Sequence, residues 1–306
     1  MESIRTLRAM CQSGKEHDPG WYVAHRKLSI YLTWLLLQAG ATPMVASLGM
    51  VVCGLAGAAL LAAPGGVANA AGFGLLYLGF LLDKADGEIA RYRRVQSTRG
   101  ILIDRFHHRL VEPLVFVAAA VHVYRATQAW GALILGLTAV VFANVVEEHQ
   151  QLPAVVLLKY VKDTGRYPPP PGSPSSRPAG ALRMLFRVLK GFRLFIVALM
   201  GLAAAYVVEA IAPVPAITVY VAVSAGALGA YTLFQVIDLW SGGMDMEIEN
   251  ATRTLSAGEV EESAPPNFRF AAGAGRNASP ETAARIEGLL PANDTQLVTG
   301  GRHEHP

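Results

Sequence analysis

Two carboxylates three residues apart, Asp83 and Asp86, stand at the end of an apolar segment, and a third, Asp104, opens the next. Side chains three or four positions apart share one face of a helix, so Asp83 lies beside Asp86, and Asp104 beside His108. Carboxylates at the end of a membrane span are costly and usually functional. Oxygen ligands grouped in this way suit a hard divalent cation. We therefore expect Asp83, Asp86, Asp104 and His108 to hold Mg²⁺ or Mn²⁺.

Small residues and an arginine accompany these carboxylates. Gly87 and Gly100 would let the backbone and a bound ring approach closely, where a side chain would block them. Arg91 follows Gly87 by one helical turn and can bind a diphosphate through two parallel hydrogen bonds. It can equally be an anchor at the cytosolic end of the span, as the neighbouring arginines are expected to be.

The composition indicates a membrane protein. The chain has 306 residues, of which 52% are hydrophobic and 16% charged, against about 25% charged in soluble domains. Its long apolar runs are needed by a bilayer and seldom by a soluble core. The net charge of +3 is small, so nucleic acid is not an expected partner. Two cysteines, Cys11 and Cys53, indicate no disulfide framework.

We predict an all-α polytopic membrane protein with six transmembrane helices and an N-terminal interfacial helix. The interfacial helix covers His25–Gln38, which is too short to span but has a basic start and an apolar body. Pro43 then suits the first turn of a new helix. The predicted spans are about 44–62, 67–90, 100–123, 129–147, 191–211 and 215–239.

The charges outside the spans predict the topology. Basic residues collect on one side, so both termini and the carboxylate cluster should face the cytosol from the cell or inner membrane. Residues 1–24 are expected to form a cytosolic arm and residues 25–240 the membrane domain, with a Pro-rich cytosolic loop at 165–181. Residues 241–306 are expected to be a disordered cytosolic tail.

The spacing D-x2-D-G-x2-A-R-x8-G-x3-D-x3-H resembles the signature of the CDP-alcohol phosphotransferases, integral membrane enzymes whose motif ends in a fourth Asp. The resemblance covers about residues 25–240, and His108 stands at the last position. The matching residues are Asp83, Asp86, Gly87, Ala90, Arg91, Gly100 and Asp104.

The resemblance implies a reaction. A phospho-alcohol group would move from a CDP-linked donor to an acceptor hydroxyl, with CMP as the leaving group and a divalent metal neutralising the diphosphate. It assigns the nucleotide to Asp83, Gly87, Ala90, Arg91 and Gly100, and members of the family are commonly homodimers. CDP-diacylglycerol with a small polar alcohol, and a CDP-linked head group with a lipid alcohol, would need the same motif.

His108 replaces the aspartate that is the family's usual candidate for the base. Histidine titrates at about pH 6.5 and is the commonest general base, so His108 and Asp104 are the candidate catalytic residues. Its nitrogen would also shift the metal preference toward Mn²⁺ or softer ions. His107 points about a quarter-turn away and is expected to be structural. The alternative is a non-catalytic CDP-lipid-binding membrane scaffold that has lost the last acid.

Two further groups of charged residues lie near span ends. Glu147, Glu148 and His149 are expected to be solvated helix-end charges, or else contacts to the acceptor. A basic face leads into the fifth predicted span and would bind anionic lipid head groups, or else form a pocket wall for an anionic acceptor or a lipid phosphate. Its members are Arg183, Arg187, Lys190 and Arg193.

Overall fold

All regular structure in the described part of the chain is helical. The computed structural model describes residues 2–13, 20–95, 97–165 and 181–240, with Met244 and Ile248. The predicted Pro-rich loop and tail lie almost wholly outside these ranges. The elements are α1 (Ile4–Cys11), α2 (Gly20–Gln38), α3 (Pro43–Ala62), α4 (Gly66–Arg93), α5 (Thr98–Phe106), the π-helical turn η1 (His107–Val111), α6 (Leu114–Thr127), α7 (Trp130–Thr164), α8 (Ala181–Phe192), α9 (Phe195–Ile211) and α10 (Ala216–Asp238).

Within the described residues, five helical segments are long and apolar enough to cross a membrane. A span needs about 20 residues, because each residue advances a helix by about 1.5 Å across a hydrocarbon core of about 30 Å. The segments are Pro43–Ala62, Gly66–Arg93, Thr98–Thr127, Trp130–Thr164 and Ala216–Asp238. The predicted fifth span corresponds to α9, an apolar helix of 17 residues that is shorter than these five. The protein is therefore an all-helical polytopic membrane protein with five candidate spans.

The helix bounds lie within about five residues of the predicted ones, except at the end of α7. Pro43 occupies the first turn of α3, and the Thr42 side chain caps that helix by accepting a hydrogen bond from the Val45 amide. The predicted fourth span was expected to end near 147, but α7 continues through Pro153 to Thr164. The charged residues at 147–149 do not end the helix, because glutamate is a good helix former and leaves the backbone ladder intact.

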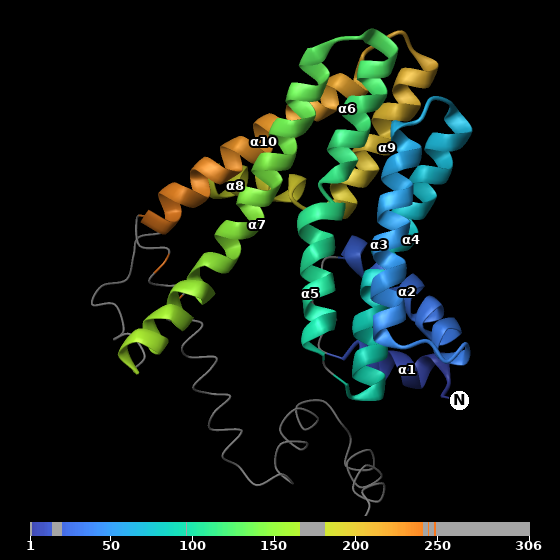
Figure 1. Cartoon of the computed structure of the whole chain (residues 1–306), viewed down its shortest axis with the longest axis vertical. Helices are drawn as coiled ribbons and strands as arrows, with labels where there is room; N and C mark the ends of the chain where they lie inside the picture. The colour runs from blue at the N-terminus through green and yellow to red at the C-terminus, as the bar shows by residue number, and fades with distance from the viewer. Residues whose placement is uncertain are drawn as a thin grey trace, which may run out of the picture.

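The helices form an elongated bundle (Figure 1). Helices α3, α4, α6 and α9 run along its long axis, whereas α7 and α10 pack together and lean away toward one end. Helices α1 and α2 contact α4 near the end of the bundle where α4 finishes and α5 begins. The chain therefore gathers its N-terminal helices around the segment that carries the carboxylates.

Helices α3 and α4 approach each other closely at a pair of glycines. A Cβ added at Gly57 would lie 2.9 Å from the Gly72 carbonyl oxygen, and one added at Gly72 would lie 2.8 Å from the Gly57 carbonyl oxygen. Small residues of this kind let helix backbones pack together in a bilayer, where no hydrophobic effect draws helices together. This contact fixes the helix pair from which the candidate site begins.

Gly72→Ala should lower the free energy of unfolding by about 1–3 kcal/mol, the usual cost of overpacking. The matched control is Gly74→Ala on the same helix, where an added Cβ meets no atom within 4 Å. That control should be neutral or slightly stabilising, because alanine is the better helix former. Thermal unfolding of the purified protein in detergent measures both variants. Equal shifts in Tm for the two would contradict the close approach.

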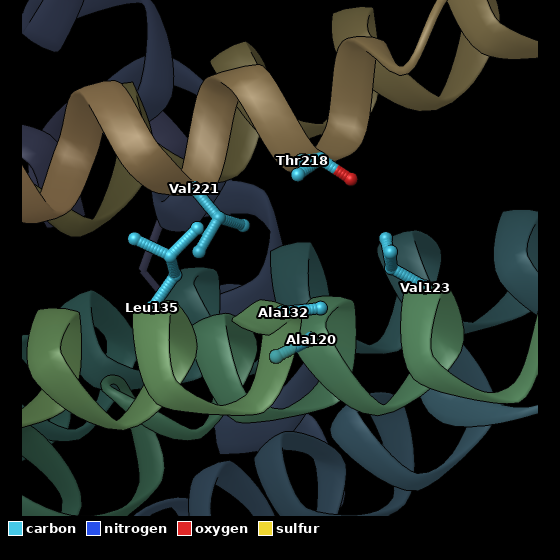
Figure 2. Close-up of a pocket in the computed structure, with 6 residues that line it drawn as sticks. All are labelled: Ala120, Val123, Ala132, Leu135, Thr218 and Val221. Atoms are coloured by element: carbon cyan, nitrogen blue, oxygen red, sulfur yellow. The ribbon is translucent and has the colours of Figure 1, made fainter. Parts of the chain in front are cut away.

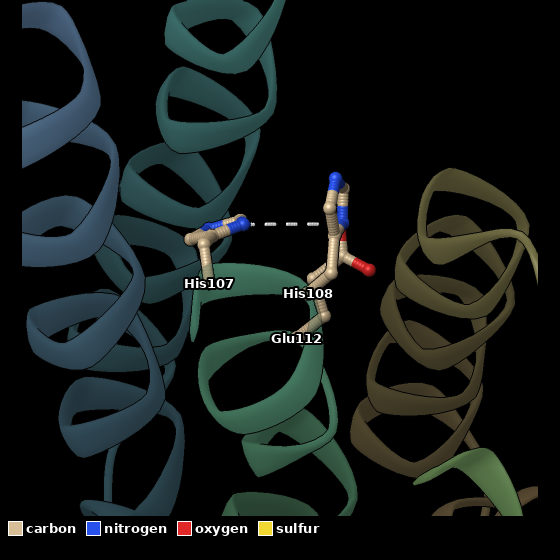
Figure 3. Close-up of side chains that lie close together, drawn as sticks. All are labelled: His107, His108 and Glu112. Carbon is tan, nitrogen blue, oxygen red and sulfur yellow. Dashed lines mark ion pairs between the residues drawn. The ribbon is translucent and has the colours of Figure 1, made fainter. Parts of the chain in front are cut away.

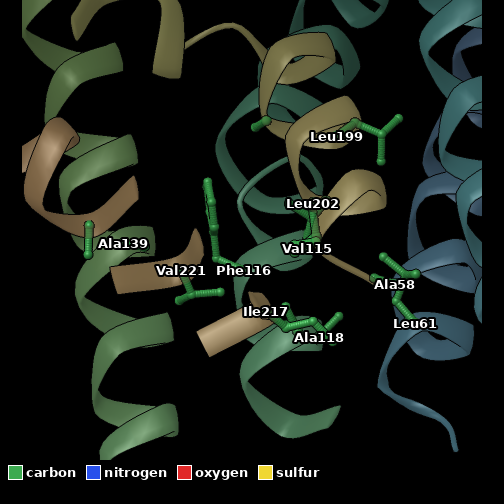
Figure 4. Packing of buried hydrophobic residues seen from close by; sticks show 14 of the residues in the cluster. Ala58, Leu61, Val115, Phe116, Ala118, Ala139, Leu199, Leu202, Ile217 and Val221 are labelled. Carbon is green, nitrogen blue, oxygen red and sulfur yellow. The ribbon is translucent and has the colours of Figure 1, made fainter. Parts of the chain in front are cut away.

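The main core joins the long helices across the bundle. In Figure 4, Val115 of α6 and Leu202 of α9 lie between Ala58 and Leu61 of α3 on one side and Phe116 of α6, Val221 of α10 and Ala139 of α7 on the other. A gap between α6, α7 and α10 is too narrow to hold a water molecule, so it is a packing seam and not a binding site. Its lining residues are Ala120, Val123, Ala132, Leu135, Thr218 and Val221 (Figure 2).

Candidate metal and nucleotide site

Three of the predicted ligands converge where α4 faces α5 and η1. Asp83 comes from α4, Asp104 from α5 and His108 from η1, and their ligand atoms all lie within 4.8 Å of one another. His108 Nε2 is 3.4 Å from Asp104 Oδ1 and 3.7 Å from Asp83 Oδ1. The helical spacing of Asp104 and His108 puts both on one face, and α4 supplies the third group from the opposite side.

This donor set fits a divalent cation. Ligands bound to one ion at about 2.0–2.2 Å lie about 3–4 Å apart, close to the separations between His108 Nε2 and the two carboxylates. Two carboxylate oxygens favour Mg²⁺ or Mn²⁺, and the imidazole nitrogen favours the softer of these. Asp83, Asp104 and His108 would therefore hold the metal, which would supply positive charge for a diphosphate.

Asp86 lies outside this group of three. Its Oδ2 accepts a hydrogen bond of 2.7 Å from the Ser47 hydroxyl of α3. The predicted ligand set is thus divided, with Asp83 turned toward α5 and η1 and Asp86 turned toward α3. Asp86 remains one turn away on the same helix, and its carboxylate is only partly buried.

Lys84 was not anticipated from the sequence. Its ammonium forms an ion pair with Asp83 and lies 4.8 Å from the centre of the Phe80 ring. A cation over an aromatic face is attracted by the ring's negative face. Lys84 therefore partly neutralises Asp83 and holds it in place.

Glu112 was also missed, although an acidic residue inside a predicted span is a signal in itself. Its Oε1 lies 2.9 Å from His108 Nδ1 and 4.0 Å from His107 Nδ1. The three side chains lie close together, His107 and His108 on η1 and Glu112 directly after it (Figure 3). His107 is buried, with its side chain 3% exposed, as expected of a structural residue.

The π-helical turn creates this grouping. The Glu112 amide donates a hydrogen bond of 3.0 Å to the His107 carbonyl, five residues back. Pro113 follows and has no N–H, so one α-helical hydrogen bond is absent at this point in any case. Such single π-turns inside α-helices are frequent at functional sites.

A polar cavity of about 160 Å³ lies beside His108. Glu147 of α7 lines it, whereas Glu148 forms an ion pair with Arg109 and His149 Nδ1 lies 2.8 Å from the Val145 carbonyl oxygen. Of the acidic residues at the end of the predicted fourth span, Glu147 thus faces the candidate site. The complete lining is Asp104, Arg105, His108, Arg109, Glu147 and Gln151.

The predicted nucleotide residues Gly87, Ala90 and Arg91 follow on α4. A Cβ added at Gly87 would lie 3.3 Å from Arg91 Nη1, so the guanidinium lies over this glycine. Arg91 Nε donates a hydrogen bond of 2.7 Å to the Cys11 carbonyl at the end of α1, where the helix dipole favours a cation. Burial raises the pKa of the Cys11 thiol to about 11.

A buried carboxylate ties the two N-terminal helices to α4. Glu88 is 0% exposed and accepts hydrogen bonds from Gln12 Nε2 at 2.8 Å, Ser29 Oγ at 2.7 Å and Thr33 Oγ1 at 2.6 Å. A buried charge is tolerated when several donors satisfy it. This network therefore holds the helix that carries Asp83 and Arg91, and neither α1 nor its contacts were anticipated from the sequence.

The remaining predicted residues lie at the edges of the site. The Gly100 amide donates to the Ser97 side chain, which caps α5. Arg193 lies in the turn between α8 and α9, with Nη2 3.6 Å from Glu147 Oε2. Arg193 therefore lies after the end of α8 and is not part of a basic face on that helix. The other three basic residues of that face belong to α8, and their side chains lie outside the described part of the structure.

These observations define a polytopic membrane protein with a candidate metal site between its second and third candidate spans. The family model of the CDP-alcohol phosphatidyltransferases matches residues 30–164, which include every residue of the motif. Over this segment the chain is similar to the CDP-alcohol phosphatidyltransferase family, membrane enzymes of phospholipid biosynthesis whose activity depends on a metal.

Other comparisons concern individual proteins. A comparison with curated proteins found no match. Among solved structures, the chain is similar to phosphatidylinositol phosphate synthase (PgsA1) of Mycobacterium tuberculosis in its apo form. The two are 20% identical with a TM-score of 0.46, and the similarity covers 69% of this chain and 95% of the other.

Proposed function

We propose that this enzyme moves a phospho-alcohol group, either phosphatidyl or head-group phosphate, from a CDP-linked donor to an acceptor hydroxyl, with release of CMP. The convergence of Asp83, Asp104 and His108 on one small volume supports this proposal most directly. A nucleotide diphosphate is itself an anion, so carboxylates can face it only when a divalent cation lies between them. Mg²⁺ or Mn²⁺ bound there would neutralise the diphosphate and the leaving phosphate.

The residues around this cluster would bind and orient the substrates. Asp83, Asp86 and Asp104 would contribute oxygen ligands. The Arg91 guanidinium would bind the diphosphate beside Gly87, where the absence of a side chain leaves room for it. Ala90 and Gly100 would complete the nucleotide site from α4 and α5. The acceptor hydroxyl would enter the polar cavity, where His108 Nε2 can take its proton if Asp83, Asp86 and Asp104 hold the metal without it.

The proposal also includes the number of spans, the orientation in the membrane and the oligomeric state. We place six spans, with α9 as the fifth, because its 17 residues extend about 25 Å and fall at the lower end of observed spans. An even number of spans puts both termini and the site on one side, which the flanking basic residues assign to the cytosol. Arg193 and its neighbours on α8 would bind lipid phosphate or an anionic acceptor, and the enzyme would act as a homodimer.

The alternative function is that of a CDP-lipid-binding scaffold without turnover. Its motivation is the replacement of the motif's last aspartate by His108. The polar cavity next to His108 favours the enzyme, because a scaffold needs no space for a second substrate.

The test is incubation of the purified protein with a panel of CDP-linked donors and acceptor alcohols, with Mg²⁺ or Mn²⁺. We expect CMP to form with at least one pair, to require the metal and to stop when EDTA is added. Binding of CDP-lipid without CMP formation from any pair would favour the scaffold. CMP formation that continues in EDTA would contradict the metal site.

A further inference from the structure

Glu112 is an ionisable residue near the middle of the third candidate span, Thr98–Thr127. A carboxylate at such a depth is expensive unless a specific partner compensates it. Its side chain is 19% exposed, so it does not reach freely into solvent. The motif does not include it, and the proposed reaction has so far given it no role.

The partner of Glu112 is the histidine of the candidate site. Glu112 Oε1 accepts a hydrogen bond from His108 Nδ1 at 2.9 Å. The second imidazole, His107, meets the His108 ring edge to face, with ring centres 5.6 Å apart. Glu112 and His107 together leave the His108 ring little freedom to turn.

Carboxylates on the two sides of the ring compete for the proton of neutral His108. Asp83 and Asp104 on the other side of the ring would attract a proton to Nε2, since their oxygens lie 3.7 and 3.4 Å from it. Glu112 is the group that favours protonation at Nδ1 instead. Both roles open to His108, metal ligand and general base, require an unprotonated Nε2.

We propose that Glu112 is the positioning residue of His108. It accepts the Nδ1 proton, fixes the ring and so presents the Nε2 lone pair to the gap between Asp83 and Asp104. The expected effect of Glu112 on the rate rests on the proposed function. The position of the proton on His108 can be observed without any turnover. Carboxylates that orient histidines in this way are typical of metal sites and of catalytic triads.

The direct test is nitrogen NMR of the histidine side chains in ¹⁵N-labelled protein saturated with Mg²⁺. The His108 signals are identified by their loss in His108→Asp. We expect Nδ1 protonated and Nε2 unprotonated in the unmodified protein. We expect the proton to move to Nε2 in Glu112→Gln, which would release this nitrogen from the metal, because an amide no longer favours the Nδ1 proton over the Asp104 side. A protonated Nε2 in the unmodified protein would overturn the proposal without any variant.

The kinetic arm uses the same variant. Glu112→Gln should lower kcat for CMP release by about 10²–10⁴-fold, the range for a misplaced or absent general base, with KM for the donor within about twofold. The matched control is Glu209→Gln, whose carboxylate accepts a hydrogen bond from the Ile217 amide at 2.8 Å. It should retain both the tautomer and the rate.

The two arms separate the two proposals. An unchanged tautomer or an unchanged kcat in Glu112→Gln would refute the role of Glu112 while leaving the transferase proposal intact. A tautomer that moves as expected, in a protein that forms no CMP from any donor, would support the positioning role and refute the proposed reaction.

Discussion

Asp83→Asn should lower the rate of CMP release by about 10³-fold or more, because it removes one charged ligand and frees the Lys84 ammonium at the same point. Losing one preorganised electrostatic contact to a transition state typically costs about 10²–10³-fold. The Lys84 ion pair of Asp83 adds to this, since an unpaired ammonium would oppose metal binding. Asp104→Asn should behave similarly, because Asp104 faces the same gap.

The measurement is the initial rate of CMP formation over a range of Mg²⁺ and Mn²⁺ concentrations. If the carboxylates act through the metal, the concentration needed for half-maximal rate should rise in both variants. Asp163→Asn is the control, because Asp163 is exposed near the end of α7 and contacts none of the three ligands. Unaltered rates in Asp83→Asn would exclude the proposed metal site.

The convergence of the three ligands could be predicted because it follows from helical periodicity. Asp104 and His108 are four apart and share a face on any helix, and the short connection after Arg93 brings the chain back toward Asp83. The same reasoning assigned Asp86 to the cluster, but the Asp86 carboxylate lies outside the group of three ligands. Spacing shows that Asp83 and Asp86 are neighbours, but not that Ser47 of α3 engages one of them.

The environment of His108 could not be predicted, because it depends on a departure from that periodicity. A spacing of 3.6 residues per turn separates His107 from the face of His108 and Glu112. The π-turn instead bonds residue 107 to residue 112 and brings all three side chains together. Pro113 indicates that the α-helical hydrogen bonding is interrupted nearby, but it does not predict that the interruption is a π-turn.

The N-terminal helix illustrates a second limit. Residues 1–24 read as a polar arm, yet Leu7 and Cys11 of α1 are each 1% exposed. Nothing in the local sequence shows that Gln12 meets Glu88 or that the Cys11 carbonyl meets Arg91. Such contacts join residues about eighty positions apart, and a single sequence without its fold does not contain them.

His108→Ala should lower kcat for CMP release by about 10²–10⁴-fold, the usual contribution of a general base. His108→Asp should be partly active, because the family motif ends in aspartate at this position. The comparison separates chemistry from packing, since both substitutions remove the imidazole but only the second restores a proton acceptor. Full activity in His108→Ala would remove His108 from the mechanism.

The double variant His108→Asp with Glu112→Leu should be more active than His108→Asp alone. In the single variant the new carboxylate would lie near Asp83, Asp104 and Glu112, and Glu112 would lose the Nδ1 donor now at 2.9 Å. Like charges this close disfavour one another, and an unpaired buried carboxylate adds its own cost. Replacing Glu112 by leucine removes the repulsion and the unpaired carboxylate in the His108→Asp background. In the background that keeps His108, Glu112→Leu should reduce kcat. Glu112 is thus expected to be beneficial with histidine at position 108 and harmful with aspartate, and the same sign in both backgrounds would show that the two residues do not act as a pair.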